Sequence, residues 1–198
     1  MKTKHFITMI AAMGLGLTAA LTGCASGGMT VTDADGNVRQ LTKDEKKRAQ
    51  EITDSLNFAV ALDAVENREF VLEADKLVFK YGQQAYVSSS TNFIALHGEK
   101  AVVQVAPFNS GGPNGVGGIT LDGRVTNLEM KKEKSGSVML SMNVMGPIIS
   151  AQVVMRLIER SNRATVTISS NFRSSRITLE GVVVPAEASN VYKGTSIP

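Results

Sequence analysis

The sequence has few of the residues on which most catalytic and metal sites depend. Its 198 residues include no tryptophan, one cysteine (Cys24) and two histidines, His5 and His97. Zinc sites are built mainly from several cysteine and histidine ligands, so this composition excludes most zinc geometries and we expect no metal site. A single cysteine also excludes an internal disulfide.

A strong charge of one sign is missing as well. If residues 1–23 are removed as a leader, Lys2 and Lys4 leave with them, and 19 basic residues face 18 acidic ones. This near-neutral balance provides no electrostatic footprint for nucleic acid, so we expect no nucleic-acid partner.

The N-terminus carries the clearest targeting pattern. A short basic stretch, "MKTKH", precedes an apolar run that ends in "LTGC" at Cys24. The run is too short and too rich in glycine for a membrane span, and its end resembles the lipobox of bacterial lipoproteins. We therefore predict a signal peptide at residues 1–23, a lipid on Cys24 and a flexible polar tether at 24–42. Because Ala25 is not an inner-membrane retention residue, we expect a lipid anchor in the outer membrane of the cell envelope.

One folded domain is expected over residues 43–198, and it begins with a helix at about 43–66. Thr42 and Glu45 have the spacing of a capping box. Apolar residues then recur at helical spacing toward Val65, and the helix is expected to cover one mouth or one face of the rest of the domain. These residues are Ala49, Ile52, Leu56, Ala59 and Val60.

After Asn67 the apolar period changes from 3.6 to 2, which is typical of strands with one wet face. The pattern predicts ten short strands, at 69–74, 77–80, 84–89, 92–97, 100–106, 124–132, 137–144, 149–159, 163–170 and 176–182. Short turns link them, so the fold class is mainly β, an antiparallel meander. A meander of this length must curl to protect its edges, which favours a barrel.

The segment "FNSGGPNGVGGITLDG" at 108–123 is unusually rich in glycine. Gly118 and Gly123 have Walker spacing, but Arg124 and Val125 stand where that motif needs lysine and a hydroxyl, so we expect no nucleotide cofactor. We interpret the segment as a loop at the barrel rim, with Asp122-Gly123 as a turn or bulge before the next strand. The candidate rim residues are Asn109, Ser110, Asn114, Gly117 and Gly118.

Few residues remain as catalytic candidates, and we expect no enzyme. Ile94 and Leu96 belong to the core set, so His97 should point outward, on the same face as Phe93 and Ala95. Carboxylates for glycoside chemistry stay open, because residues distant in the sequence can meet in space. The four candidates are Glu73, Asp75, Glu129 and Glu159.

Three segments, taken in order, resemble the Bacteroidetes envelope lipoproteins grouped as domain of unknown function (DUF) 4251. They are "NREFVLEADKLVF", "VVQVAPFNSGGPNGVGGITLDGRVTN" and "RATVTISSNFRSSRITLEGVVVP", within about 61–184. The family has a leucine where Ala106 stands, and a tyrosine where Leu179 stands. The resemblance implies a lipocalin-like β-barrel and assigns no activity or catalytic residues.

Three functions remain open at this point. The first is a tethered, non-catalytic module that binds a small apolar or amphipathic ligand. The second is a structural or protein-interaction subunit of an envelope complex. The third is a carboxylate-dependent hydrolase. An internal apolar cavity of roughly 300 Å³ or more would favour the first, a filled barrel with an exposed apolar patch the second, and converging carboxylates the third.

Overall fold

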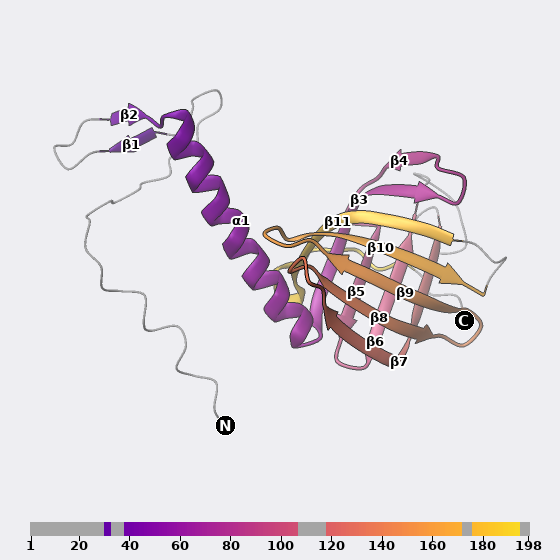
Figure 1. Ribbon diagram of the computed structural model, residues 1–198. Helices are drawn as coiled ribbons and strands as arrows, with labels where there is room; N and C mark the ends of the chain where they lie inside the picture. Colours follow the sequence, from indigo (N-terminus) through magenta and orange to yellow (C-terminus); the bar gives the residue numbers. More distant parts are fainter. Residues whose placement is uncertain (1–29, 33–37, 107–117, 172–175, 195–198) are drawn as a thin grey trace. The chain divides into compact units, whose positions relative to one another are not determined.

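The computed structural model describes residues 30–32, 38–106, 118–171 and 176–194 (Figure 1). It consists of two compact units, Met1–Glu51 and Ile52–Pro198. Helix α1 (Lys43–Glu66) begins in the first unit and ends in the second, and its bounds confirm the predicted helix.

The first unit contains a small hairpin and the start of the helix. Strands β1 (Thr30–Thr32) and β2 (Val38–Gln40) pair antiparallel, with Thr30 opposite Gln40. The capping box is confirmed, since Thr42 Oγ1 accepts from the Glu45 amide at 3.3 Å and Glu45 Oε2 accepts from the Thr42 amide at 2.9 Å. These bonds satisfy amides that have no partner inside the helix, which fixes where α1 begins.

The second half of α1 buries a different face from the one that the sequence favours. Ile52, Leu56 and Val60 are 62%, 62% and 52% exposed, whereas Ala61, Ala64 and Val65 are buried in the core. Small alanine side chains let the last two turns approach the barrel closely, and the larger apolar residues are left outside. Among the described residues, no helix is long and apolar enough to cross a membrane.

The second unit is a closed antiparallel barrel. Its eight strands follow the order β3-β5-β6-β7-β8-β9-β10-β11, and β11 pairs back onto β3. The short strand β4 (Gln84–Tyr86) pairs with the far half of β3. This arrangement confirms the predicted antiparallel meander curled into a lipocalin-like barrel with one N-terminal helix. The barrel strands are β3 (Glu69–Phe79), β5 (Phe93–His97), β6 (Lys100–Val105), β7 (Ile119–Lys132), β8 (Val138–Met145), β9 (Ser150–Leu157), β10 (Arg163–Ser170) and β11 (Arg176–Pro185).

Two details of the predicted strands are wrong. The stretches 69–74 and 77–80 form the single strand β3, because a register shift against β11 at Glu180/Gly181 lets β3 continue past Asp75. Strand β7 begins at Ile119, so Asp122-Gly123 is neither a turn nor a bulge but paired strand opposite Val102 and Ala101. A Cβ on Gly123 would lie 2.5 Å from Met145 O, so glycine is needed there for close packing and not for turning.

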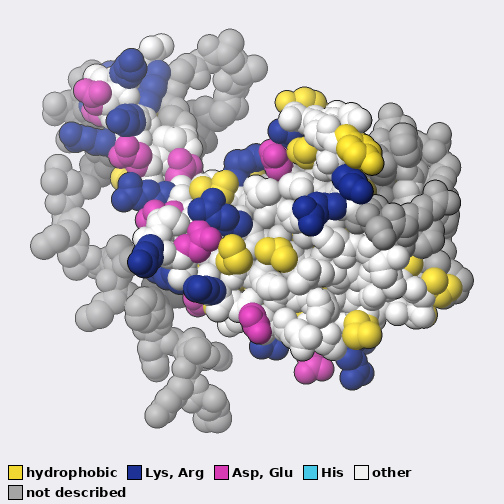
Figure 2. All heavy atoms as spheres, turned by 45° about the vertical axis from the view of Figure 1, so that its right-hand side comes forward, with side chains coloured by type: hydrophobic (Ala, Val, Ile, Leu, Met, Phe, Trp, Pro, Cys, Tyr) yellow, Lys and Arg dark blue, Asp and Glu magenta, His cyan; other side chains and the backbone are white. Residues whose placement is uncertain are grey.

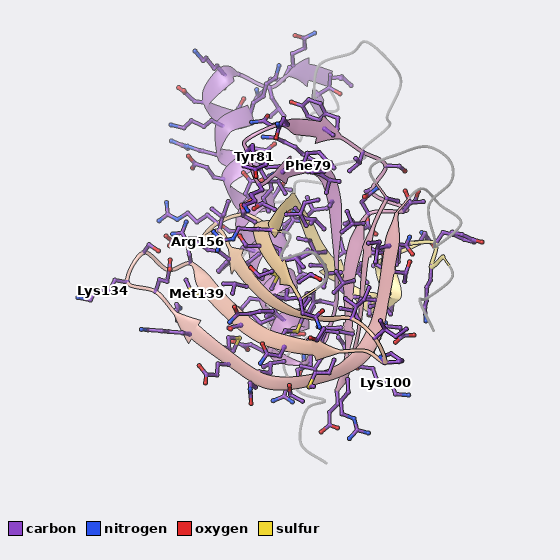
Figure 3. The ribbon with its side chains drawn as sticks, turned by 90° about the vertical axis from the view of Figure 1, so that its right-hand side faces the viewer. Phe79, Tyr81, Lys100, Lys134, Met139 and Arg156 are labelled. Carbon is purple, nitrogen blue, oxygen red and sulfur yellow. The ribbon has the colours of Figure 1, made fainter. Side chains whose placement is uncertain are left out.

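The barrel interior is one continuous apolar cluster. Residues at alternate positions of every barrel strand point inward and pack together, including Leu72, Leu96, Leu140, Met155 and Leu179. In Figure 3 the strands curve around the side chains that fill the centre of the barrel. The predicted inward face of the closing hairpin is confirmed, since Val166, Ile168 and Leu179 are buried and Ile177 is half-buried.

Because the strands are antiparallel, their connections fall at two ends of the barrel. We call one the helix end, where the α1–β3, β5–β6, β7–β8 and β9–β10 connections lie. We call the other the loop end, where the β3–β4, β6–β7, β8–β9 and β10–β11 connections lie. The glycine-rich segment belongs to the β6–β7 connection and hence to the loop end.

Candidate binding surfaces of the barrel

The loop end carries five apolar side chains that are only half-buried. Phe79 lies opposite Ile177 across β3 and β11, and Val105 lies opposite Ile119 across β6 and β7. Val87, after β4, also packs against the core cluster from this side. We call these five residues the apolar rim. Half-buried apolar surface at a barrel mouth is the kind of surface on which a small apolar ligand can sit.

Other apolar side chains at the loop end lie outside the apolar rim. Tyr81, in the turn after β3, and Ile148, in the β8–β9 turn, are exposed. Tyr81 and Phe79 lie close together at the end of β3 (Figure 3). Figure 2 shows hydrophobic side chains, in yellow, scattered over the visible surface of the second unit. The loop end therefore presents apolar groups both at its rim and around it.

Most of the candidate rim loop lies outside the described residues. Asn109, Ser110, Asn114 and Gly117 fall there, as do Cys24 and the leader. Gly118 is described, and it sits half-buried directly before β7. A Cβ on Gly118 would lie 1.7 Å from Val105 O, so the close approach of β7 to β6 requires glycine at this position.

His97 points outward as predicted. It is exposed, and its Nδ1 lies 2.9 Å from Glu69 Oε2 on the neighbouring strand. This partner is a carboxylate and not the hydroxyl of a nucleophile, so a surface hydrogen bond with Glu69 accounts for the position of the imidazole.

The four candidate carboxylates have separate surroundings. Asp75 pairs with Arg163 at 3.0 Å, and Glu73 accepts a hydrogen bond from the Ser189 hydroxyl at 2.6 Å. Glu129 is exposed on β7, and Glu159 lies 3.9 Å from Arg160. The described part of the chain contains no group of three or more His, Cys, Asp or Glu residues able to hold a metal ion. This geometry gives no support to a hydrolase.

Within the described ranges, two ionisable groups have shifted pKa values, and both belong to surface ion pairs. Hydrogen bonds from Arg39 and from Thr42 hold the pKa of the Glu45 carboxyl well below its usual range. The hydrogen bond to Asp75 raises the pKa of Arg163 further above its already high value. In both cases the hydrogen bonds stabilise the charged form of the side chain. Neither group is therefore tuned to exchange a proton near neutral pH.

A second apolar cluster, which the sequence pattern did not predict, lies on the outer face of the barrel. Val71, Phe93 and Ala95 point outward from β3 and β5, yet they are buried. Residues that follow β11 cover them, with Ala186 and Val191 packed against the cluster. We call residues 189–194 the strap. Strand alternation identifies the outward face of a strand, but not whether a later segment of the chain covers that face.

Two buried amides fasten the segments around this cluster. Asn92 Oδ1 accepts from the Ala106 amide at 2.7 Å, and its Nδ2 donates to Ala106 O and Ser88 O. It thereby fixes the end of β6, where the glycine-rich segment starts. The side chain of Gln104 is fully buried beside the strap.

Comparison with known proteins agrees with this barrel. A family model described as "Domain of unknown function (DUF4251)" matches residues 53–183. The chain belongs to the DUF4251 family. A crystal structure of a DUF4251 family protein from Bacteroides eggerthii is 40% identical, covers 71% of this chain and 95% of its own, and superposes with a TM-score of 0.63. No curated protein matches the chain.

The match bears on the unit boundary as well as on the fold. Residues 53–183 begin near the middle of α1 and end in β11. The family region therefore coincides with the barrel and the helical turns that pack on it. The strap lies just beyond the matched residues.

Proposed function

We propose that this DUF4251 chain is a lipid-anchored envelope protein that binds a small apolar or amphipathic molecule at the loop end of its barrel, and that it is not an enzyme. The observation that carries the proposal is the apolar rim, where five side chains remain half-buried and four of them pack against the apolar interior. Burying such a rim under an acyl or ring group is favourable by about 25 cal/mol for each Å² removed from water.

A titration with cis-parinaric acid, a fluorescent fatty acid, tests the binding site. We expect parinaric acid to bind the full chain saturably. The substitution Ile119→Asn should weaken this binding at least tenfold, because it places a polar amide in the apolar rim. Leu128→Asn is the matched control, since Leu128 is also partly buried against the core but lies on the other half of β7. Absence of saturable binding, or equal weakening by both variants, would contradict the proposal.

The anchor is tested separately. Cys24→Ala should abolish incorporation of an alkyne fatty-acid analogue and move the protein out of the membrane fraction, because the cysteine thiol is the attachment point for the lipid. Undiminished labelling of the variant would refute this part of the proposal and leave the ligand site untouched. Fractionation of inner and outer membranes then tests the predicted outer-membrane address.

A protein-interaction role is the second candidate function. It is favoured by the filled barrel interior and by the stripe of Ile52, Leu56 and Val60, which is exposed along α1. If this stripe contacts a partner protein, Leu56→Glu should remove a defined cross-link formed in intact cells and leave the binding of parinaric acid unchanged. A cross-link unaffected by this variant would exclude the stripe as the contact.

A further inference from the structure

The outer face of four adjacent strands carries side chains in aligned rows. Glu73, Phe93, Gln104 and Thr120 lie directly opposite one another across β3, β5, β6 and β7. The outer face of a barrel strand normally meets water, but here Phe93 is 1% exposed and Gln104 is 0% exposed. The strap covers this row, and we call the strip of outer face beneath the strap the groove.

The strap lies in this groove and follows the row from one side to the other. At β3, the Ser189 hydroxyl donates to Glu73 Oε1 at 2.6 Å. At β6, Gln104 bonds to Tyr192 and Gly194, and beyond it Lys193 pairs with Asp122 of β7. The contacts follow the order of the strands, so the strap crosses them in an extended path.

Gln104 is positioned to bind a peptide backbone. Its Nε2 donates to Thr91 O at 3.0 Å and its Oε1 accepts from Thr120 Oγ1 at 2.8 Å, and these two bonds fix the orientation of the amide. The remaining donor and acceptor point at the strap, to Tyr192 O at 2.8 Å and from the Gly194 amide at 2.7 Å. All four hydrogen-bonding positions of the amide are therefore used, and half of them contact main-chain atoms two residues apart.

Apart from the Ser189 hydroxyl at β3, the side chains of the strap contribute to this contact at two positions. Tyr192 is 63% exposed, while Val191 packs against the outer apolar cluster and Lys193 faces Asp122. An extended segment with a β-branched residue and, two positions later, a basic residue would make the same contacts. The groove thus recognises a backbone shape and two side chains rather than one unique sequence.

The strap is also weakly fastened compared with a strand. Among the described residues, one backbone-to-backbone bond, from the Tyr192 amide to Ser90 O at 2.7 Å, joins residues 190–194 to the barrel. The strap's other described polar contacts with the barrel are side-chain bonds with Glu73, Gln104 and Asp122. No ladder of backbone bonds has to break, so the strap can open locally without unfolding the barrel. Opening would expose the outer apolar cluster and leave the Gln104 amide without two of its four hydrogen-bond partners. Covering this surface again with a peptide is therefore favourable.

We propose that this groove is a peptide-binding site, that the strap occupies it in cis, and that an extended segment of a separate envelope protein with the same β-branched and basic pattern replaces the strap. The site is distinct from the apolar rim, because its row lies on the outer face of β3, β5, β6 and β7, although Gln104 and Thr120 are next to the rim pair Val105 and Ile119 along the strands. The covalent link gives the strap a high effective concentration, so a partner segment competes best where it is itself concentrated at the same membrane.

Fluorescence anisotropy with a labelled peptide of residues 187–198 tests the site. The probe is titrated with the chain truncated after Ala188 and with the full chain. We expect saturable binding to the truncated chain and at least tenfold weaker binding to the full chain, because the strap competes. In the truncated background, Gln104→Met should weaken binding at least tenfold, whereas Gln152→Met, on the exposed outer face of β9, should leave it unchanged.

The peptide itself offers matched variants. Replacing its valine with aspartate should abolish binding, and replacing its lysine with glutamate should weaken binding most at low salt, because it faces Asp122. A folded truncated chain that does not bind the peptide, or that binds it equally well with Gln104→Met, would overturn the proposal.

A second measurement uses only the full chain, in case truncation prevents folding. Hydrogen exchange should show that the Tyr192 and Gly194 amides are protected. An excess of unlabelled peptide should lower this protection at least tenfold and leave the protection of the barrel amides unchanged. Unchanged protection at the highest peptide concentration would overturn the proposal. A concentration-dependent dimer of the full chain with exchanged straps would overturn the assignment to a separate partner and make a second copy the occupant.

Discussion

Replacing Phe93 with alanine gives the sharpest test of the outer apolar cluster. Phe93 points away from the barrel interior, but it is 1% exposed because the segment after β11 covers it. A buried phenylalanine removes about 150 Å² or more from water, and at about 25 cal/mol for each Å² this contributes about 4 kcal/mol. The value agrees with the about 3–5 kcal/mol found when buried phenylalanines become alanine.

His97→Ala is the matched control, since His97 lies on the same strand and the same face. Its side chain is 55% exposed and its one ion pair, with Glu69, lies at the surface. Such pairs contribute about 0–1 kcal/mol, so this substitution should leave the free energy of unfolding almost unchanged. The two variants therefore separate burial by the C-terminal segment from position on the strand.

Urea denaturation followed by circular dichroism measures both effects. With a slope of about 2 kcal/mol per M, Phe93→Ala should lower the midpoint by about 2 M and His97→Ala by less than about 0.5 M. In the chain truncated after Ala188 the cost of Phe93→Ala should shrink, because Phe93 then loses part of its cover before it is replaced. Equal midpoints for Phe93→Ala and His97→Ala would refute the burial of the outer face.

Three further predictions concern the fold. Ile168→Asp should cost more than about 4 kcal/mol and Thr167→Asp far less, because Ile168 is buried in the barrel and Thr167 is not; equal melting temperatures would mean that the register of β10 is wrong. Gly181→Ala should cost about 1–3 kcal/mol in urea denaturation, since its Cβ would lie 2.0 Å from a β3 carbonyl oxygen; an unchanged midpoint would contradict this clash. NMR titration should place the pKa of Glu45 below its usual value of about 4.3 and show that Arg39→Ala raises it. Because the folded pKa is lowered, this ion pair stabilises the start of α1 at neutral pH and its contribution is lost as the pH falls below about 4.

Local signals determined the elements of this protein. The capping box at Thr42 and Glu45 fixed the start of α1, because those bonds join residues three apart and depend on no distant segment. Strict alternation identified the inward side of most strands, since a strand with one wet face must alternate. The scarcity of histidine and cysteine likewise excludes most zinc geometries and an internal disulfide on composition alone.

The ends of the elements depended on their neighbours. Strand β7 starts five residues before its predicted position because Ile119 to Gly123 pair with β6, and a glycine-rich sequence carries no sign of that partner. Likewise, β3 continues through Asp75 because β11 follows it with a shift in register at Gly181. These pairings join residues from 14 positions apart, as for Val105 and Ile119, to more than 100 positions apart, as for Phe70 and Pro185, and no local pattern records them.

Only the tertiary structure decided which outward faces are covered. Alternation places Phe93, Ala95 and His97 together on one side of β5, and it treats the three alike. The structure separates them, because the chain after β11 returns across that side and covers the first two but not the third. The same return of the chain gives Gln104 its partners in the strap. The exposed face of α1 is likewise a result of tertiary packing. Ala61 and Ala64 fit against the closed barrel, and the larger Ile52 and Leu56 stay exposed.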